Sequence, residues 1–131
     1  MVIDNQLLDK LSAQAKANPR LRQNMDLRNS PEDLSQRMLN ALEPGTVMPI
    51  HRHRASSETV VLLRGKIQWV FYDDNGTETE RVTLDANGDL RMINVERDRW
   101  HSLVCLEEGS VLYESKDGAY EPLGEDEVME L

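Results

Sequence analysis

The sequence predicts a mainly β protein, built as one small antiparallel barrel or sandwich with a single α-helix at its N-terminal end. Three observations support this fold class. A helical spacing of apolar residues occurs once, near the start of the chain. From residue 35 onward the sequence consists of short runs rich in Val, Ile, Leu and aromatic residues. Turn dipeptides separate these runs at regular intervals with no helical pattern between them, which is typical of antiparallel β-folds.

The length of the chain favours one domain with a single core. A chain of 131 residues buries roughly two thirds of the surface that its unfolded form exposes. We expect residues 1–34 to form the helix and an extension that packs on the barrel, and residues 35–122 to form the barrel. Residues 123–131 are strongly acidic and predict a solvated or frayed tail.

The charge balance argues against nucleic acid as a partner. The net charge is -9, and 24 acidic residues outnumber 15 basic ones, whereas a phosphate backbone is held by Lys and Arg. No apolar run approaches the ~18 residues of a membrane span. The single cysteine, Cys105, excludes an internal disulfide, and residues 1–19 lack the pattern of a signal peptide. We therefore expect a cytoplasmic protein whose partner is a small molecule.

The first element is an amphipathic helix that begins after Asp4 and ends before Pro19. Asp4 is a favourable N-cap residue, and proline cannot continue a helix. The apolar residues of one face follow the helical period: Leu7, Leu8, Leu11 and Ala15. This face predicts packing against the strands.

The strands are separated by dipeptides that favour turns: Pro44-Gly45, Arg64-Gly65, Asn75-Gly76, Asn87-Gly88, Glu108-Gly109 and Asp117-Gly118. The clearest hairpin lies in residues 66–84, KIQWVFYDDNGTETERVTL, where an aromatic strand is followed by an Asn-Gly turn and a polar return strand. Exposed edge strands tend to pair with a second copy, so we expect a homodimer with the helix or the first strand near the interface.

All three histidines of the chain can meet on one face of such a fold. If residues 47–53 form a strand, alternation places His51 and His53 on the same face. A hairpin turn at residues 54–57 would then bring Glu58 opposite this pair, and His101 would enter from a later strand. Three imidazoles and one carboxylate can hold a divalent metal and leave coordination positions open. The alternative is an ordinary polar strand face, which is the more common role of a lone His-x-His pair.

The residues from Gly45 to Gly65, GTVMPIHRHRASSETVVLLRG, resemble the first cupin motif, G-x5-H-x-H-x4-E-x6-G, at every fixed position. The segments QRMLNALEPGTVMPIHRH, WHS and YESKDGAYEP are similar to the WbuC-type cupin metalloproteins, a resemblance that covers about Arg22 to Pro122. Two features depart from it. The second cupin motif has Glu96, Asp98 and Cys105 where P-x-G and an asparagine are usual, and the segment RQNMDLRNS lacks a histidine that relatives of this type carry.

The resemblance implies a jelly-roll barrel, or double-stranded β-helix, with one divalent ion per chain. The implied ligands are His51, His53, Glu58 and His101, and Zn, Fe, Mn, Ni or Cu each suit this set. Proteins of this type are small bacterial proteins associated with surface-polysaccharide gene clusters, which implies a small oxygen-rich substrate such as a sugar derivative. Two classes of function fit this site: a metal-dependent isomerase, lyase or oxygenase, and a non-catalytic binding module that holds its ligand through the metal.

Four residues of the segments that resemble this family are candidates for substrate binding: Arg37, Trp100, Lys116 and Tyr120. Arg54 and Glu114 lie in the same segments. Lys116 and Tyr120 flank an Asp-Gly turn, where a loop can fold over the mouth of a barrel. The competing interpretation of these charged residues is ordinary surface charge.

Overall fold

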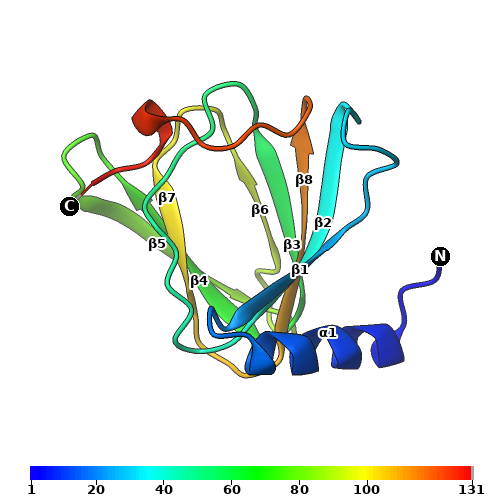
Figure 1. The fold of residues 1–131 in the computed structure, drawn as a ribbon. Coiled ribbons are helices and arrows are strands. Elements are labelled where there is room, and N and C mark those ends of the chain that lie inside the picture. The colour runs from blue at the N-terminus through cyan, green and yellow to red at the C-terminus, as the bar shows by residue number, and fades with distance from the viewer. Residues whose placement is uncertain (131) are drawn as a thin grey trace.

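Two antiparallel sheets face each other across the main core, and one helix lies outside the larger sheet (Figure 1). The structure is a computed structural model and describes residues 1–130. The elements follow in the order α1 (Asn5–Ala17), β1 (Arg22–Asp26), β2 (Ser35–Leu42), β3 (Glu58–Arg64), β4 (Lys66–Tyr72), β5 (Glu78–Asp85), β6 (Met92–Val95), β7 (His101–Cys105), β8 (Ser110–Asp117) and a 3-10 turn, η1 (Glu125–Glu127). The mainly β class with one N-terminal helix is therefore confirmed.

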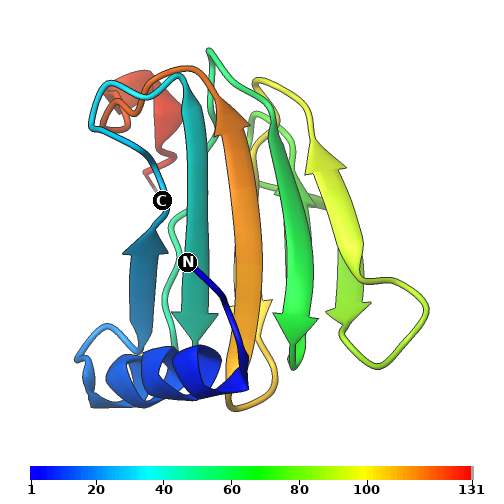
Figure 2. The ribbon, with the colours of Figure 1, turned by 90° about the vertical axis from the view of Figure 1, so that its right-hand side faces the viewer.

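The larger sheet has the strand order β1-β2-β8-β3-β6, and the smaller sheet has the order β5-β4-β7. Figure 2 shows the larger sheet from outside, with α1 crossing the lower ends of β1, β2 and β8. The predicted hairpin is confirmed as the β4–β5 pair, in which Trp69 lies opposite Val82. Hydrogen bonds among residues 1–130 form two separate sheets and do not close them into one barrel.

Apolar side chains fill the space between the two sheets because alternate residues of each strand point inward. On β3, the burial pattern places Glu58, Val60 and Leu62 inward. The core that they join is formed by the following buried residues: Leu42, Val60, Leu62, Ile67, Trp69, Phe71, Leu84, Val95, Leu103, Cys105 and Leu112. This core occupies one end of the space between the sheets and leaves the other end to polar side chains.

The helix covers a second, smaller core on the outer face of the larger sheet. Its N-cap is Asp4, as predicted, because Asp4 Oδ1 accepts a hydrogen bond of 3.0 Å from the backbone of Leu7. The buried residues of this core come from α1, β2 and β8: Leu8, Leu11, Ala15, Leu39, Ala41 and Val111. None of the helices in residues 1–130 has the length and apolar content needed to cross a membrane.

The acidic C-terminal segment, which the sequence predicted as a solvated or frayed tail, exposes Glu125, Asp126 and Glu130 and pairs with the chain through its backbone. The backbone of Arg52 donates to Glu127 O at 2.9 Å, and the backbone of Met129 donates to Ile50 O at 2.9 Å. Glu127 also accepts a hydrogen bond of 2.9 Å from the backbone of Arg54. These backbone partners hold the segment as far as Met129, and Leu131 lies outside the described residues.

Candidate metal centre and ligand cavity

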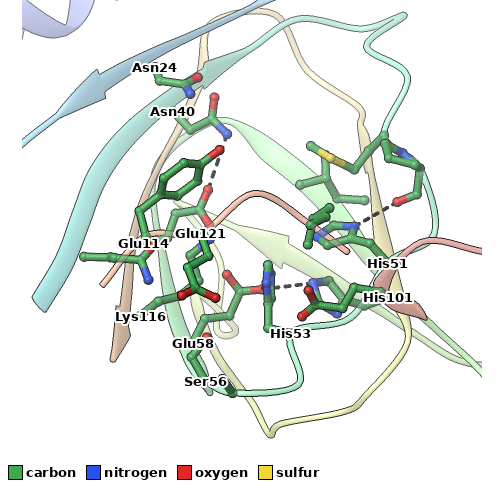
Figure 3. Close-up of a pocket in the computed structure, with 18 of the residues that line it drawn as sticks. Asn24, Asn40, His51, His53, Ser56, Glu58, His101, Glu114, Lys116 and Glu121 are labelled. Atoms are coloured by element: carbon green, nitrogen blue, oxygen red, sulfur yellow. Dashed lines mark hydrogen bonds and ion pairs between the residues drawn. The ribbon is translucent and has the colours of Figure 1, made fainter. Parts of the chain in front are cut away.

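The candidate site is a cavity of about 500 Å³ at the polar end of the space between the two sheets. Strands β1, β2, β3 and β8 line one side, β4 and β7 line the other, and residues from the segments 48–56 and 117–127 complete the lining. Figure 3 shows the three imidazoles on one side and the polar side chains of β1, β2 and β8 facing them.

The three histidines come together in this cavity. His101 is the first residue of β7, and His51 lies beside it as an isolated bridge partner. The ring centroid of His51 is 4.4 Å from that of His101 and 5.1 Å from that of His53, and the His53 and His101 centroids are 5.6 Å apart. One nitrogen of each ring lies within 4.8 Å of the others. This spacing lets all three nitrogens face one ion.

The backbone segments that place His51, His53 and Glu58 near each other do not form the predicted hairpin. Residues 47–53 form no regular strand, and only His51 makes a β-bridge there. The prediction was wrong because both edges of β3 are already paired, one with β6 and the other with β8. Pro49 in addition lacks the backbone N–H that a strand would use. His51 and His53 therefore lie on the side of β7, and Glu58 approaches from the opposite sheet.

The outer nitrogens of two imidazoles are fixed by backbone carbonyls. His51 Nδ1 lies 2.9 Å from Pro49 O, and His101 Nδ1 lies 2.8 Å from Arg99 O. A carbonyl oxygen only accepts hydrogen bonds, so both Nδ1 atoms carry the proton and both Nε2 atoms keep a free lone pair. Hydrogen bonds of this kind, from the nitrogen that faces away from the centre, orient the histidines of metal sites.

Glu58 is the carboxylate closest to the imidazoles. Its side chain is almost fully buried, and its Oε1 lies 2.9 Å from His101 Nε2 and 3.7 Å from His53 Nε2. Two ligands that each lie about 2.1 Å from one ion at a right angle are about 3.0 Å apart. The separation of Glu58 Oε1 and His101 Nε2 therefore suits two ligands of the same ion.

Burial determines the protonation of these groups. Loss of water lowers the pKa of His51 to about 4 and that of His53 to about 3, and it also lowers the pKa of His101. The same loss of water raises the pKa of Glu58. At neutral pH the three imidazoles are neutral, which is the form that binds metal.

The residues present fit a divalent ion. His101 Nε2 is buried and makes no hydrogen bond within the described chain, although Glu58 Oε1 lies 2.9 Å away. A buried nitrogen without a hydrogen-bond partner is costly unless another group uses its lone pair. An ion held by the three Nε2 atoms would use it, and imidazole with carboxylate is a donor set that transition metals accept.

A wall of polar side chains faces the histidines from the larger sheet. Gln36 and Asn40 lie on β2, and Glu114 and Lys116 lie on the neighbouring β8, in a register that directs all four inward. Asn40 Nδ2 donates to Glu114 Oε1 at 3.4 Å. Burial and the nearby charge of Glu58 raise the pKa of Glu114 to about 7. The wall thus combines donors, acceptors and charge at positions that an ordinary core would give to apolar residues.

The structure separates the four candidate substrate-binding residues into two pairs. Lys116 and Tyr120 line the cavity. Arg37 lies outside it and pairs with Asp33 at 2.9 Å. Trp100 is buried next to the cavity without lining it; its Nε1 donates to Asp74 at 3.0 Å.

Several lining residues were not singled out from the sequence: Arg20, Arg22, Asn24, Gln36, Asn40 and Ser102. The segment RQNMDLRNS contributes to the cavity through Arg22 and Asn24, without a histidine. A signal for the β2 residues did exist, because Gln36 and Asn40 are polar residues at alternate positions of a predicted strand. Alternation alone did not say which face of that strand is inside.

Three solved structures of known proteins share this architecture. KdgF from Halomonas sp. is 17% identical, with 77% of this chain and 82% of that chain covered and a TM-score of 0.61. The capsular polysaccharide assembling protein CapF from Staphylococcus aureus is 19% identical, with 83% and 31% covered and a TM-score of 0.68. Oxalate oxidase in complex with glycolate is 13% identical, with 79% and 54% covered and a TM-score of 0.64.

These neighbours are cupin-fold proteins, and this chain has the cupin fold. It spans about a third of the CapF chain and about half of the oxalate oxidase chain. No curated protein matches the sequence. The chain belongs to the family described as Domain of unknown function (DUF6016), whose model matches residues 3–84.

Proposed function

We propose that this protein binds one divalent metal ion per chain and uses it to hold a small oxygen-rich ligand. The proposed ion ligands are His51, His53 and His101 through Nε2 and Glu58 through a carboxylate oxygen. The single observation that carries the proposal is the buried Nε2 of His101, which makes no hydrogen bond and faces the other two rings. Zn, Fe, Mn, Ni and Cu all suit this donor set.

A bound ion would act as a Lewis acid that polarises an oxygen of the ligand. The chain itself supplies the enclosure. Trp69 stacks on the His101 ring at 5.3 Å and keeps water from that side of the imidazole. The carbonyls of Pro49 and Arg99 hold two rings in orientation. Glu114 and Lys116 face the centre from the larger sheet and can exchange protons and hydrogen bonds with a ligand.

The proposed activity is an isomerase, lyase or oxygenase reaction on a small hydroxylated molecule such as a sugar derivative. A carboxyl group next to the centre that is not among the proposed ion ligands, Glu114, favours an enzyme over a simple binder, because such reactions need a group that moves protons. CapF is a capsular polysaccharide assembling protein, and the WbuC-type resemblance also points to surface polysaccharides. A non-catalytic metal-dependent binding module is the alternative.

The test is metal analysis of the protein as isolated, followed by a turnover screen with the identified metal restored. One equivalent of a transition metal supports the metal-binding proposal, and protein that neither retains nor takes up metal contradicts it. Product formation from any sugar derivative in the screen supports the enzyme. Saturable binding of a screened compound without turnover supports the binding module instead.

We also propose that the protein assembles as a homodimer. Strand β1 is an edge of the larger sheet, and edge strands are commonly covered by a second copy. Light scattering at micromolar concentration should report twice the mass of the chain. A monomer mass at that concentration would contradict the assembly without affecting the metal site.

A further inference from the structure

The cavity gathers most of the buried polar atoms that lack a partner. In residues 1–130, four buried side-chain nitrogen or oxygen atoms make no hydrogen bond: Ser12 Oγ, Asn40 Oδ1, Trp69 Nε1 and His101 Nε2. The last three belong to residues that line this one cavity. Each such atom costs about 1–3 kcal/mol if it stays unpaired. The proposed ion accounts for His101 Nε2, and the other two atoms, Asn40 Oδ1 and Trp69 Nε1, indicate that a bound molecule supplies their partners.

Asn40 offers an acceptor from the larger sheet. It is 6% exposed, and its Nδ2 already donates to Glu114 Oε1 at 3.4 Å. That hydrogen bond orients the amide and leaves Oδ1 to receive a hydrogen bond. A ligand must therefore bring a donor to this position.

Trp69 offers a donor from the smaller sheet. It is 3% exposed, and its ring is held parallel to the His101 ring with an interplanar angle of 16°. The indole Nε1 only donates, so its partner must be an acceptor. A hydroxyl group both donates and accepts, so a molecule with several hydroxyl groups can satisfy Asn40 and Trp69 from the same cavity.

Lys116 adds a positive charge to the cavity wall, opposite Glu58 in the β3–β8 register and on the same strand as Glu114, without a direct ion pair to either. Within residues 1–130 it makes no ion pair, although the chain carries 24 acidic residues. On the outer face of the same sheet, by contrast, Arg37 is paired with Asp33 at 2.9 Å. In a protein with a net charge of -9, an unpaired ammonium group inside a cavity is suited to an anionic group of a ligand.

We propose that Asn40, Trp69 and Lys116 are the ligand-recognising residues of this cavity and that they select a polyhydroxy carboxylate. The carboxylate faces Lys116, one hydroxyl group donates to Asn40 Oδ1, and another oxygen accepts from Trp69 Nε1. This inference rests on the proposed function, because it names the substrate class of the same metal-containing site. It adds a selection by charge and hydroxyl pattern that the metal alone cannot give.

Three six-carbon probes separate the two parts of the recognition in calorimetric titrations of the metal-loaded full chain. Gluconate carries hydroxyl groups and a carboxylate, sorbitol carries hydroxyl groups alone, and hexanoate carries a carboxylate alone. We expect gluconate to bind at least about tenfold more tightly than either of the others, because it adds one charged contact relative to sorbitol and two hydrogen bonds relative to hexanoate. Equal affinity for gluconate and sorbitol would overturn the role of charge, and equal affinity for gluconate and hexanoate would overturn the role of the hydroxyl groups.

Single substitutions then assign each contact. Asn40→Leu and Trp69→Phe should each weaken gluconate at least about fivefold and leave hexanoate unchanged, since each removes one hydrogen bond to a hydroxyl group. Lys116→Met should weaken both carboxylates. Arg37→Gln is the matched control, because Arg37 lies on β2 with Asn40 but on the outer face. Trp69→Phe keeps an aromatic ring, so it tests the proposal even if Asn40→Leu fails to fold.

Metal content, measured on every variant, distinguishes failure of the metal site from failure of the ligand recognition. A parent protein without metal contradicts the proposed function. A parent protein with metal, whose affinity for gluconate is unchanged by Asn40→Leu, Trp69→Phe and Lys116→Met, contradicts only the recognition proposed here. Loss of metal from these three variants would also contradict it, because the residues would then act on the ion and not on the ligand.

Discussion

The backbones of His51 and His101 form a reciprocal pair of hydrogen bonds. The N–H of His51 donates to His101 O at 2.9 Å, and the N–H of His101 donates to His51 O at 2.8 Å. This closed pair of hydrogen bonds fixes a residue of an irregular segment to the first residue of β7. Two imidazoles are thereby placed side by side before any ion binds, which lowers the entropy cost of ordering the ligands when the ion arrives.

Removing two imidazoles together should abolish metal loading. In the variant that combines His51→Ala with His53→Ala, only His101 and Glu58 remain near the centre, and two ligands hold a divalent ion weakly. Elemental analysis after dialysis measures the result. Arg52→Gln is a suitable control because Arg52 lies between the two histidines and stacks on Trp100 at 4.3 Å. Stoichiometric metal in the double variant would refute the assigned ligands.

Glu58→Gln should fold like the parent protein when metal is absent and gain less stability when metal is added. The amide has nearly the same size as the carboxylate but carries no charge and coordinates poorly. Stabilisation by a bound ion follows RT ln(1 + [M]/Kd), so a tenfold weaker site loses about 1.4 kcal/mol at saturating metal. Melting curves with chelator and with titrated metal give the comparison. An equal gain in both proteins would show that Glu58 is not a ligand.

Between about pH 5.5 and 7.5, metal affinity should depend on pH less steeply than it would at a site of three ordinary imidazoles. An ordinary imidazole, with a pKa of about 6.5, is mostly protonated at pH 5.5, so three of them would release nearly three protons on binding metal. Burial lowers the pKa of His51 to about 4 and that of His53 to about 3, so both are already neutral at pH 5.5. His101, whose pKa is also lowered, and Glu58, whose pKa is raised, are the two remaining groups that can release a proton, so affinity should rise with pH by no more than about a hundredfold per unit.

Competition titrations against a chelator of known pH dependence measure this slope. The Glu58→Gln variant should lose the part of the slope that Glu58 contributes, because the amide does not titrate. A slope near three in the parent protein would mean that the imidazoles are protonated before metal binds, contrary to the protonation states that burial imposes.

Gly65→Ala should destabilise the protein by about 3 kcal/mol. Gly65 has a φ of 84°, and a Cβ at this position would overlap Ser110 Oγ and lie 2.8 Å from Ser110 Cα. Gly109→Ala is the control that measures backbone strain without a steric collision. Gly109 has a φ of 71°, but a Cβ there would meet no heavy atom within 4 Å. That control should cost about 1 kcal/mol. Urea unfolding compares the two, and equal losses would contradict the collision with Ser110.

Local features of the sequence predicted the elements whose interactions are local. The Asp4 cap and the apolar face of residues 5–17 are set by neighbours in the sequence, and so is the Asn75-Gly76 turn between β4 and β5. The histidine face of β7 also followed from simple alternation, since Leu103 and Cys105 are buried with His101. These elements needed no knowledge of distant pairing.

The pairing of distant strands could not be read from the sequence. Residues 47–53 alternate like a strand, but the partners of β3 come from residues more than 30 positions away. The polar wall depends on β2 and β8, which are adjacent only in the folded sheet. Polar residues on a strand indicate an outer face in most proteins. Their inward position at Asn40 and Glu114 is visible only once the two sheets are in place.

The C-terminal segment has a practical consequence for work with this protein. Met129 and Glu127 hydrogen-bond to the backbone on either side of His51. A truncation that removes residues 124–129 would delete these hydrogen bonds, which fix the backbone around His51. Residues 1–3, by contrast, are exposed and take no part in the hydrogen bonds around His51, so changes there should leave the imidazoles in position.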